Sequence, residues 1–229
     1  ADSAESLWQT APDLKAQPMT PQEVQHHFTH ADGSYRFARW VRPIVPVVFG
    51  VEEATLAVIK GAIEAMVATV GHRLAETDPE QGANLFLFFL RDWSEIGGIP
   101  EMEGLVPGIM AQVPRLEAAG ADQYRHFRFE ADGAIRACIA FVRMGGPLAD
   151  LPAADLTLAL AAQSLLLWSD QAFRDRPALV ATAEGAVLRS DIAALLRAAY
   201  DPALPAVARD QSHALRLSAR TIAHALGNS

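Results

Sequence analysis

The strongest constraint on the fold is a pair of alternating segments joined by Asp132 and Gly133. The segment QYRHFRF precedes the turn, AIRACIAFVRM follows it, and polar and apolar side chains alternate through much of both. Alternation is typical of a strand with one face against a core, and Gly133 supplies the positive φ that a tight hairpin turn needs. The sequence therefore predicts a β-hairpin over about residues 123–143.

A capping box begins the first predicted helix. Thr20 and Glu23 hold the Ncap and N3 positions around Pro21, a proline in the first turn. The helix is expected to run from about Pro21 to His30. The next segment, residues 35–50, contains two prolines and a Val-Val-Phe run, which favours a strand at the edge of a sheet.

Residues 51–72 predict a long helix, because apolar side chains recur there at spacings of three and four. They are Leu56, Ile59, Ile63, Met66 and Val70. Gly71 is the expected C-terminal stop. The apolar run ANLFLFFL, residues 83–90, predicts a strand covered on both faces, and thus the central strand of the sheet. A helix of a few turns is expected within residues 105–120.

From Pro152 onward the pattern predicts helices throughout. The first contains LALAAQSLLLWSD, Leu158 to Asp170. The second, SDIAALLRAAYDP, has Ser190 as its expected Ncap, and a third ends the chain. The expected fold class is α+β, with a mixed sheet of about four strands, packed by helices, and a helical C-terminal third.

The domain division follows from the same reading. We expect an extended segment over residues 1–19, a single α+β domain over residues 20–205, and a C-terminal helix over residues 206–229 that packs on it. With 229 residues, of which 51% are hydrophobic, the chain can bury a substantial core. Cys138 is the only cysteine, which excludes an internal disulfide and argues against a Cys-based zinc site.

The charge distribution and the first residues of the sequence limit which partners and which cellular compartment are expected. The net charge of −8 is spread without a basic run, so nucleic acid is not an expected partner. The longest uncharged stretch, residues 156–169, is shorter than the roughly 20 residues that a transmembrane helix needs. The chain begins ADSAES rather than with Met, as after signal-peptide removal, although a trimmed fragment would look the same. We expect a periplasmic or secreted protein, either free or membrane-associated through a lipidated N-terminus.

Several short motifs are spread between about Val24 and Pro205. They are Trp40 with Pro43, Ala83-Asn84-Leu85, Gln163 with Leu165 and Leu167, Asp170, and Asp191 with Leu195, Tyr200 and Asp201. In this order they resemble an uncharacterised bacterial family of secreted proteins and lipoproteins, catalogued only as a domain of unknown function. The resemblance implies export and assigns no biochemical role.

That family is similar in its order of elements to the zincin metallopeptidases, which carry an HExxH motif on the helix after the hairpin. In the motif, two imidazoles one turn apart bind zinc, and the intervening Glu activates the bound water. The resemblance places Ala159 and Gln163 at the two His positions and Leu160 at the Glu position. Ala159 and Leu160 can neither bind zinc nor take up a proton. The resemblance therefore implies a zincin-like scaffold with no catalytic residue, metal or cofactor.

Histidines elsewhere in the sequence leave a zinc-dependent hydrolase as an alternative function. His26 and His30 stand one turn apart in the first predicted helix, which is a spacing suited to two ligands. His72 and His126 could approach in space. Histidines near helix ends also serve as capping or solvated side chains, so a metal site and a capping role both remain open.

Arginine and aromatic side chains cluster on two predicted strands. Arg36, Arg39 and Trp40 lie on the first, and Tyr124 and Arg128 lie on the hairpin. These residue types are enriched where proteins meet partners, although alternating burial explains the same pattern. The sequence predicts a non-catalytic exported protein that binds another envelope protein. A metal-dependent hydrolase or peptidase with unusual His ligands is the alternative.

Overall fold

A computed structural model describes residues 19–80, 82–183 and 185–226. The extended segment expected at residues 1–19 lies outside this part of the chain, except for Met19. The first half contains α1 (Pro21–Phe28), β1 (Phe37–Ala38), β2 (Pro46–Phe49), α2 (Glu53–Thr69), β3 (Leu85–Leu90), the 3-10 helix η2 (Trp93–Gly98), α3 (Met102–Leu105) and α4 (Ile109–Ala118). The second half contains β4 (Gln123–Phe129), β5 (Ile135–Arg143), the 3-10 helix η3 (Pro147–Asp150), α5 (Ala153–Ser164), β6 (Leu179–Thr182), β7 (Gly185–Leu188), α6 (Ser190–Ala199), β8 (Val207–Ala208) and α7 (Ser212–Leu226).

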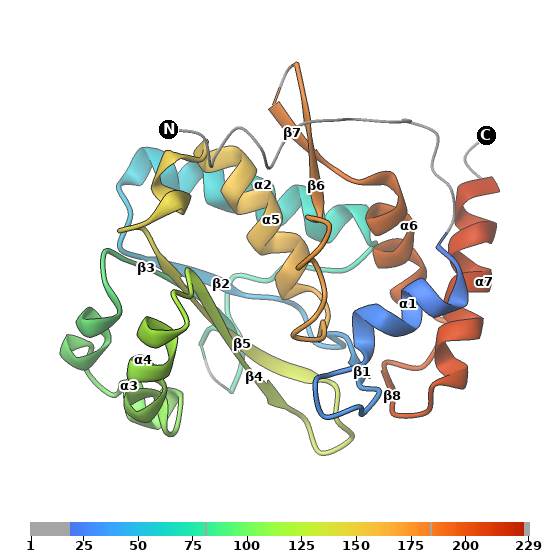
Figure 1. Ribbon diagram of the computed structural model, residues 1–229, viewed down its shortest axis with the longest axis horizontal. Coiled ribbons are helices and arrows are strands. Elements are labelled where there is room, and N and C mark those ends of the chain that lie inside the picture. Colours follow the sequence, from blue (N-terminus) through green and yellow to red (C-terminus); the bar gives the residue numbers. More distant parts are fainter. Residues whose placement is uncertain (1–18, 81, 184, 227–229) are drawn as a thin grey trace.

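A four-stranded mixed sheet in the order β2-β3-β5-β4 forms the centre of the molecule (Figure 1). β2, β3 and β5 are parallel, whereas β4 runs antiparallel to β5. The predicted hairpin is confirmed, with Gly133 at a φ of 91° in its turn. The central position of β3 and the edge position of the proline-bearing β2 are confirmed as well. The chain therefore has the expected α+β class.

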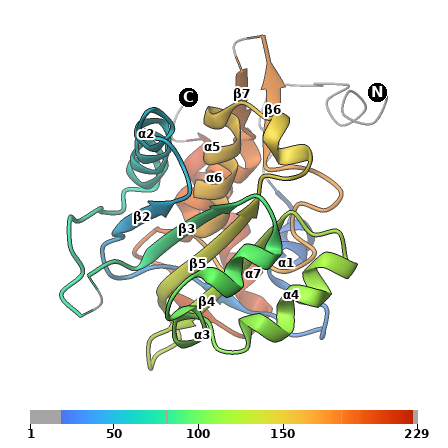
Figure 2. The same ribbon diagram turned by 90° about the vertical axis from the view of Figure 1, so that its left-hand side faces the viewer.

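Helices cover both faces of the sheet (Figure 2). On one face, η2, α3 and α4 bury a smaller core that includes Trp93, Ile109 and Phe141 of β5. On the other face, α2 and α5 pack side by side over a larger core that includes Ile63 and Leu160. Burial of side chains of this size contributes about 1.5 to 3 kcal/mol each, so the two cores hold both helical layers on the sheet.

The C-terminal helix α7 packs against α6 and α1 (Figure 1). The Ser218 hydroxyl donates to the Met19 carbonyl oxygen at 2.8 Å, which ties α7 to the residue just before the α1 cap. β1 pairs with β8 through Phe37 and Ala208. The two ends of the described chain are thus joined to each other by both helix and strand contacts.

The C-terminal third is not helical throughout, contrary to the prediction. β6 and β7 form an antiparallel hairpin that projects beyond the helices (Figure 1). Its Ala-rich sequence resembles a helix former, but Gly185, at a φ of 124°, adopts a conformation that suits a turn rather than a helix. Ser190 is the first residue of α6 rather than its Ncap, which is Arg189.

The helix predicted across Leu158 to Asp170 ends early, at Ser164. The residues that follow it are drawn into strand-like pairing instead. Leu166 forms a bridge with Arg39, and the Leu167 amide donates to the Ala38 carbonyl oxygen at 2.9 Å. No helix in the described part of the chain combines the length and apolar character needed to cross a membrane.

Candidate functional site

The helix that the zincin resemblance singles out, α5, serves the packing of the domain. Leu160 is only 1% exposed and belongs to the larger core. Ala159 and Gln163 are half-buried, and Gln163 Oε1 is enclosed without a hydrogen-bond partner among the described residues. These three positions present methyl, isobutyl and amide groups, which supply neither an imidazole ligand nor a general base.

Two motif residues hold the C-terminal end of α5. The Trp40 indole N–H donates to the Ser164 carbonyl oxygen at 2.8 Å. The Tyr200 hydroxyl donates to the Leu165 carbonyl oxygen, also at 2.8 Å. The last turn of a helix leaves its carbonyl oxygens without intrahelical donors. Trp40 and Tyr200 therefore supply tertiary donors at the point where α5 must stop.

A third motif residue, Asn84, joins the segment that precedes β2 to the segment that precedes β3. Asn84 is fully buried. Its side chain accepts a hydrogen bond from the Val45 amide at 2.8 Å and donates to the Pro43 carbonyl oxygen at 2.9 Å. It also donates to the Asp78 carboxylate at 3.1 Å. The motif residues Trp40, Asn84 and Tyr200 thus maintain the fold.

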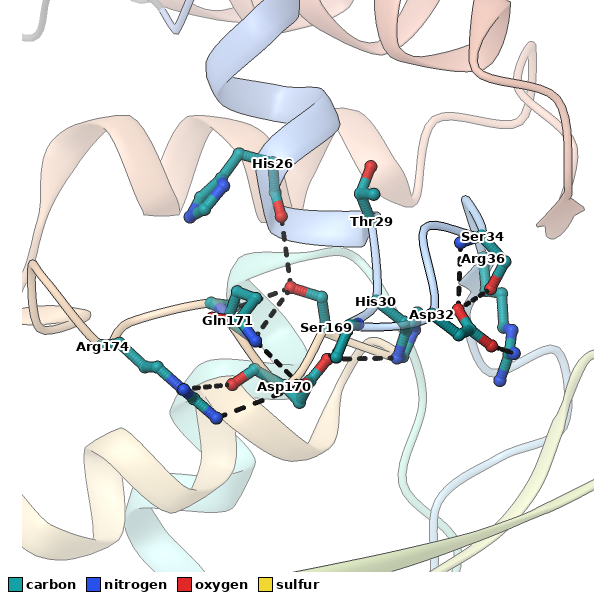
Figure 3. Close-up of polar contacts among 12 residues, drawn as sticks. His26, Thr29, His30, Asp32, Ser34, Arg36, Ser169, Asp170, Gln171 and Arg174 are labelled. Carbon is teal, nitrogen blue, oxygen red and sulfur yellow. Dashed lines mark hydrogen bonds and ion pairs between the residues drawn. The ribbon is translucent and has the colours of Figure 1, made fainter.

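His26 and His30 do not share a helical face as predicted. α1 ends at Phe28, and the extended Thr29, with φ −93° and ψ 113°, takes His30 off the helix. The two imidazoles point in different directions in Figure 3. His30 Nδ1 lies 3.9 Å from the Asp170 carboxylate.

The turn after α5 forms a polar clamp on the end of α1 (Figure 3). The Ser169 amide donates to the His27 carbonyl oxygen at 2.8 Å, and the Ser169 hydroxyl donates to the His26 carbonyl oxygen at 3.2 Å. Asp170 accepts a hydrogen bond from the Ala31 amide at 2.9 Å. Because these bonds satisfy backbone groups at a helix end, Asp170 acts as a structural residue.

His72 lies in another part of the molecule. Its Nε2 is 2.9 Å from the Arg42 carbonyl oxygen, and its ring packs against Tyr200. Burial lowers the pKa of His72 and also that of His126 on β4. Within residues 19–80, 82–183 and 185–226, no three His, Cys, Asp or Glu side chains are grouped to hold a metal ion. The structure does not bring the predicted ligands together.

A cleft of ≈ 340 Å³ lies between α1, the loop after α5 and the start of α6. Burial lowers the pKa of His27, one of its walls, to about 4, so this imidazole is neutral at pH 7. Phe173 lines the cleft with a φ of 67°, a conformation that is rare for a bulky residue. Arg189 is 8% exposed and forms a forked pair with Asp191, so its charge is compensated within the protein.

The outer edge of β4 presents backbone groups that β5 does not use. The Arg143 amide donates to the Asp122 carbonyl oxygen at 2.8 Å, which sets the alternation of the antiparallel ladder. The amides and carbonyls of Gln123, Arg125 and Phe127 consequently point away from β5. In the described part of the chain, β4 pairs with β5 alone, and no other hydrogen bond reaches these groups.

Cationic and aromatic side chains predominate along β4. The strand consists of Gln123, Tyr124, Arg125, His126, Phe127, Arg128 and Phe129. Arg128 is exposed, and Phe129 is 43% exposed. Neither Arg125 nor Arg128 pairs with a carboxylate of the described residues. This edge is therefore basic, although the chain as a whole carries a net charge of −8.

The predicted partner-binding residues on the earlier strand lie elsewhere. Trp40 is fully buried, so it must be removed from the predicted surface. Arg36 pairs with Asp32, and the Arg39 guanidinium lies 5.4 Å from the centre of the Tyr200 ring. Both arginines therefore already make contacts within the chain.

Of the predicted partner-binding residues, Tyr124 and Arg128 lie on the open edge. Arg125 belongs to the same cluster of arginine and aromatic side chains on this strand. Periodicity places Arg125 on the same face of the strand as Phe127, but it does not show that the strand edge is open or that Arg125 has no carboxylate partner among the described residues. Both facts depend on elements distant in the sequence.

Comparison of the chain with protein-family models, with curated proteins and with solved structures found no significant match.

Proposed function

We propose that this protein is a non-catalytic binding protein of the cell envelope, periplasmic or secreted, that takes up an extended segment of another envelope protein along β4. The open edge carries this proposal. Gln123, Arg125 and Phe127 direct their backbone donors and acceptors outward, as derived from the β4–β5 register. Partners commonly bind such an edge by adding a strand, in which main-chain hydrogen bonds supply affinity and alternate side chains supply specificity.

The two edges of the sheet differ in a way that favours β4. β2 at the other edge has 4 residues and begins with Pro46, and short strands and prolines are common protections against strand addition. β4 has 7 residues and no proline. Charged side chains on an edge can also deter association, so binding must be measured to separate recognition from protection.

The non-catalytic part of the proposal rests on α5. A zincin-like scaffold is supported by the order of β4, β5 and α5, because α5 follows the hairpin where the resemblance expects an active-site helix. Ala159 and Leu160 offer no ligand or base at the expected positions. The scaffold is thus proposed to keep a peptide-binding edge without a reaction.

Selection of linear peptides against the purified chain tests the proposal. The selected peptides should slow amide hydrogen exchange at Gln123, Arg125 and Phe127. Gln123→Pro should weaken binding at least tenfold, because proline removes an outward N–H, whereas Gln123→Ala keeps that N–H and is the matched control. Equal binding to both variants, or protection confined to another surface, would refute strand addition at β4.

The hydrolase alternative is tested by metal analysis of the untagged chain. The proposal expects no stoichiometric zinc and no change in thermal stability with chelator. Zinc at one equivalent that is lost in His26→Ala would support a metal-dependent hydrolase instead. Cell fractionation of the full-length gene product tests export, and recovery in the cytoplasm alone would contradict it.

A further inference from the structure

Arg125 is a half-buried cation that lacks a carboxylate partner among the described residues. Its side chain lies on the larger-core side of the sheet, close to Cys138 of β5. Among the described residues its guanidinium has one hydrogen-bond acceptor, the neutral Gln123 Oε1, 2.8 Å from Arg125 Nη1. Burial lowers the pKa of Arg125, as expected for a guanidinium that has lost water without gaining a counter-charge.

Two other half-buried arginines have the counter-charge that Arg125 lacks, whereas half-buried Arg39 lies over the Tyr200 ring instead. Arg42 Nη1 is 2.9 Å from Asp78, and Arg143 Nη2 is 2.5 Å from Asp122. A carboxylate offsets the desolvation of the cation in both cases. For Arg125, a carboxylate from outside the described residues would supply the same compensation.

We propose that Arg125 determines the specificity of the β4 edge by binding an Asp or Glu side chain of the incoming segment. This inference rests on the proposed function, because it requires a strand paired with β4. The backbone of Arg125 points outward, so a paired strand places one residue directly opposite it, with Cβ atoms about 5 Å apart on the same face. An acidic side chain there accepts charge-assisted hydrogen bonds from the guanidinium nitrogens that Gln123 does not engage.

Phe127 adds an apolar contact to the same recognition. It lies two residues from Arg125 on the same face and packs, partly buried, against the larger core. The residue of the bound strand opposite Phe127 is therefore two positions from the acidic residue. The expected pattern is an acidic and an apolar residue separated by one residue, in an order set by the direction of the bound strand.

The test uses an acetylated, amidated peptide of sequence TVTETVT and its isosteric partner TVTQTVT. Valine stands two positions from the glutamate on both sides, so either strand direction brings it opposite Phe127. We expect the glutamate peptide to bind the wild-type chain at least tenfold more tightly. Arg125→Met should abolish this difference, whereas Arg128→Met, on the other face of β4, should preserve it.

The outcomes separate this inference from the proposed function. Equal affinities with protection of the β4 amides would overturn the role of Arg125 and leave strand addition standing. No protection of these amides by either peptide at millimolar concentration would overturn both. If a TVTQTVT peptide with a free C-terminus binds as tightly as the glutamate peptide, Arg125 recognises a terminal carboxylate. That result would refute recognition of an acidic side chain. The two-peptide comparison on the wild-type chain decides the matter even if Arg125→Met does not fold.

Discussion

Trp40 and Ser164 are separated by 124 residues in the sequence, yet the indole N–H of Trp40 donates to the Ser164 carbonyl oxygen at 2.8 Å. Trp40→Phe removes this donor and leaves a buried acceptor with a gap beside it. We expect the free energy of unfolding to fall by about 2 to 4 kcal/mol. Urea unfolding followed by Trp fluorescence or circular dichroism measures this loss. A loss under 1 kcal/mol would contradict this account of how α5 ends.

Tyr200→Phe tests the second donor at the same helix end. Only the hydroxyl is lost, and with it the hydrogen bond to the Leu165 carbonyl oxygen. The expected cost is about 1 to 2 kcal/mol, again from urea unfolding. Tyr124→Phe is the matched control, since no hydroxyl hydrogen bond of Tyr124 is present among the described residues. Equal effects of the two substitutions would refute the role of Tyr200.

Asn84→Leu tests the junction ahead of the sheet. Leucine has a similar volume but leaves the Val45 amide and the Pro43 carbonyl oxygen without their side-chain partners. We expect a loss of about 2 to 4 kcal/mol in unfolding free energy. Thermal unfolding of the variant beside wild type measures it, and an unchanged Tm would show that water replaces Asn84 at no cost.

Gly50→Ala and Gly71→Ala form a matched pair. Both glycines have a positive φ, at 80° and 66°, but a Cβ on Gly50 would stand 2.1 Å from the Phe89 carbonyl oxygen, whereas a Cβ on Gly71 meets nothing within 4 Å. Gly71→Ala should cost about 1 kcal/mol for its backbone conformation. Gly50→Ala should cost about 3 kcal/mol or more, because backbone must also move. Chemical denaturation of both variants would reveal the difference, and equal losses would contradict it.

Acid should destabilise the fold through His213. This residue is fully buried, its Nδ1 is 2.8 Å from the Tyr35 hydroxyl, and burial together with the nearby Arg216 lowers its pKa from 6.5 to about 4. Between about pH 6.5 and pH 4, His213 is therefore protonated in the unfolded chain but neutral in the folded chain. Stability is fully present above about pH 6.5 and is lost as pH falls toward 4, by on the order of 2 to 3 kcal/mol.

The pH effect is measured by urea unfolding at pH 7, 5.5 and 4.5. His27, with a pKa of about 4, acts in the same direction. His213→Gln keeps a hydrogen-bonding group for Tyr35 but cannot titrate, so the unfolding free energy of the variant should decline less between pH 6.5 and 4.5 than that of wild type. Parallel curves would exclude His213 as a source of acid sensitivity.

Local sequence patterns were sufficient for the hairpin, the capping box of α1 and the α+β class. The positive φ at Gly133 and the reciprocal bonds of Thr20 and Glu23 involve residues within a few positions of one another. Such signals act through nearest neighbours and depend little on the rest of the chain. Burial of Ile59 and Ile63 on one face of α2 followed from periodicity for the same reason.

Local patterns failed where a distant segment decided the outcome. Apolar periodicity predicted a helix through Leu166, but pairing with Arg39 ended α5 at Ser164. His26 and His30 had helical spacing, but α1 ends at Phe28, before His30. The Ala31 amide, just after His30, donates to Asp170 instead of continuing the helix. In each case competing tertiary hydrogen bonds outweighed a propensity worth a few tenths of a kcal/mol per residue.

The candidate site divides in the same way. The sequence by itself determined that β4 would be an alternating strand bearing Tyr124, Arg125 and Arg128. Only the tertiary structure decided that this strand lies at an edge and that Arg125 is half-buried with no carboxylate paired to it among the described residues. Strand order and counter-charges depend on which remote segments pack together, and that information is carried by the whole chain rather than by any window of it.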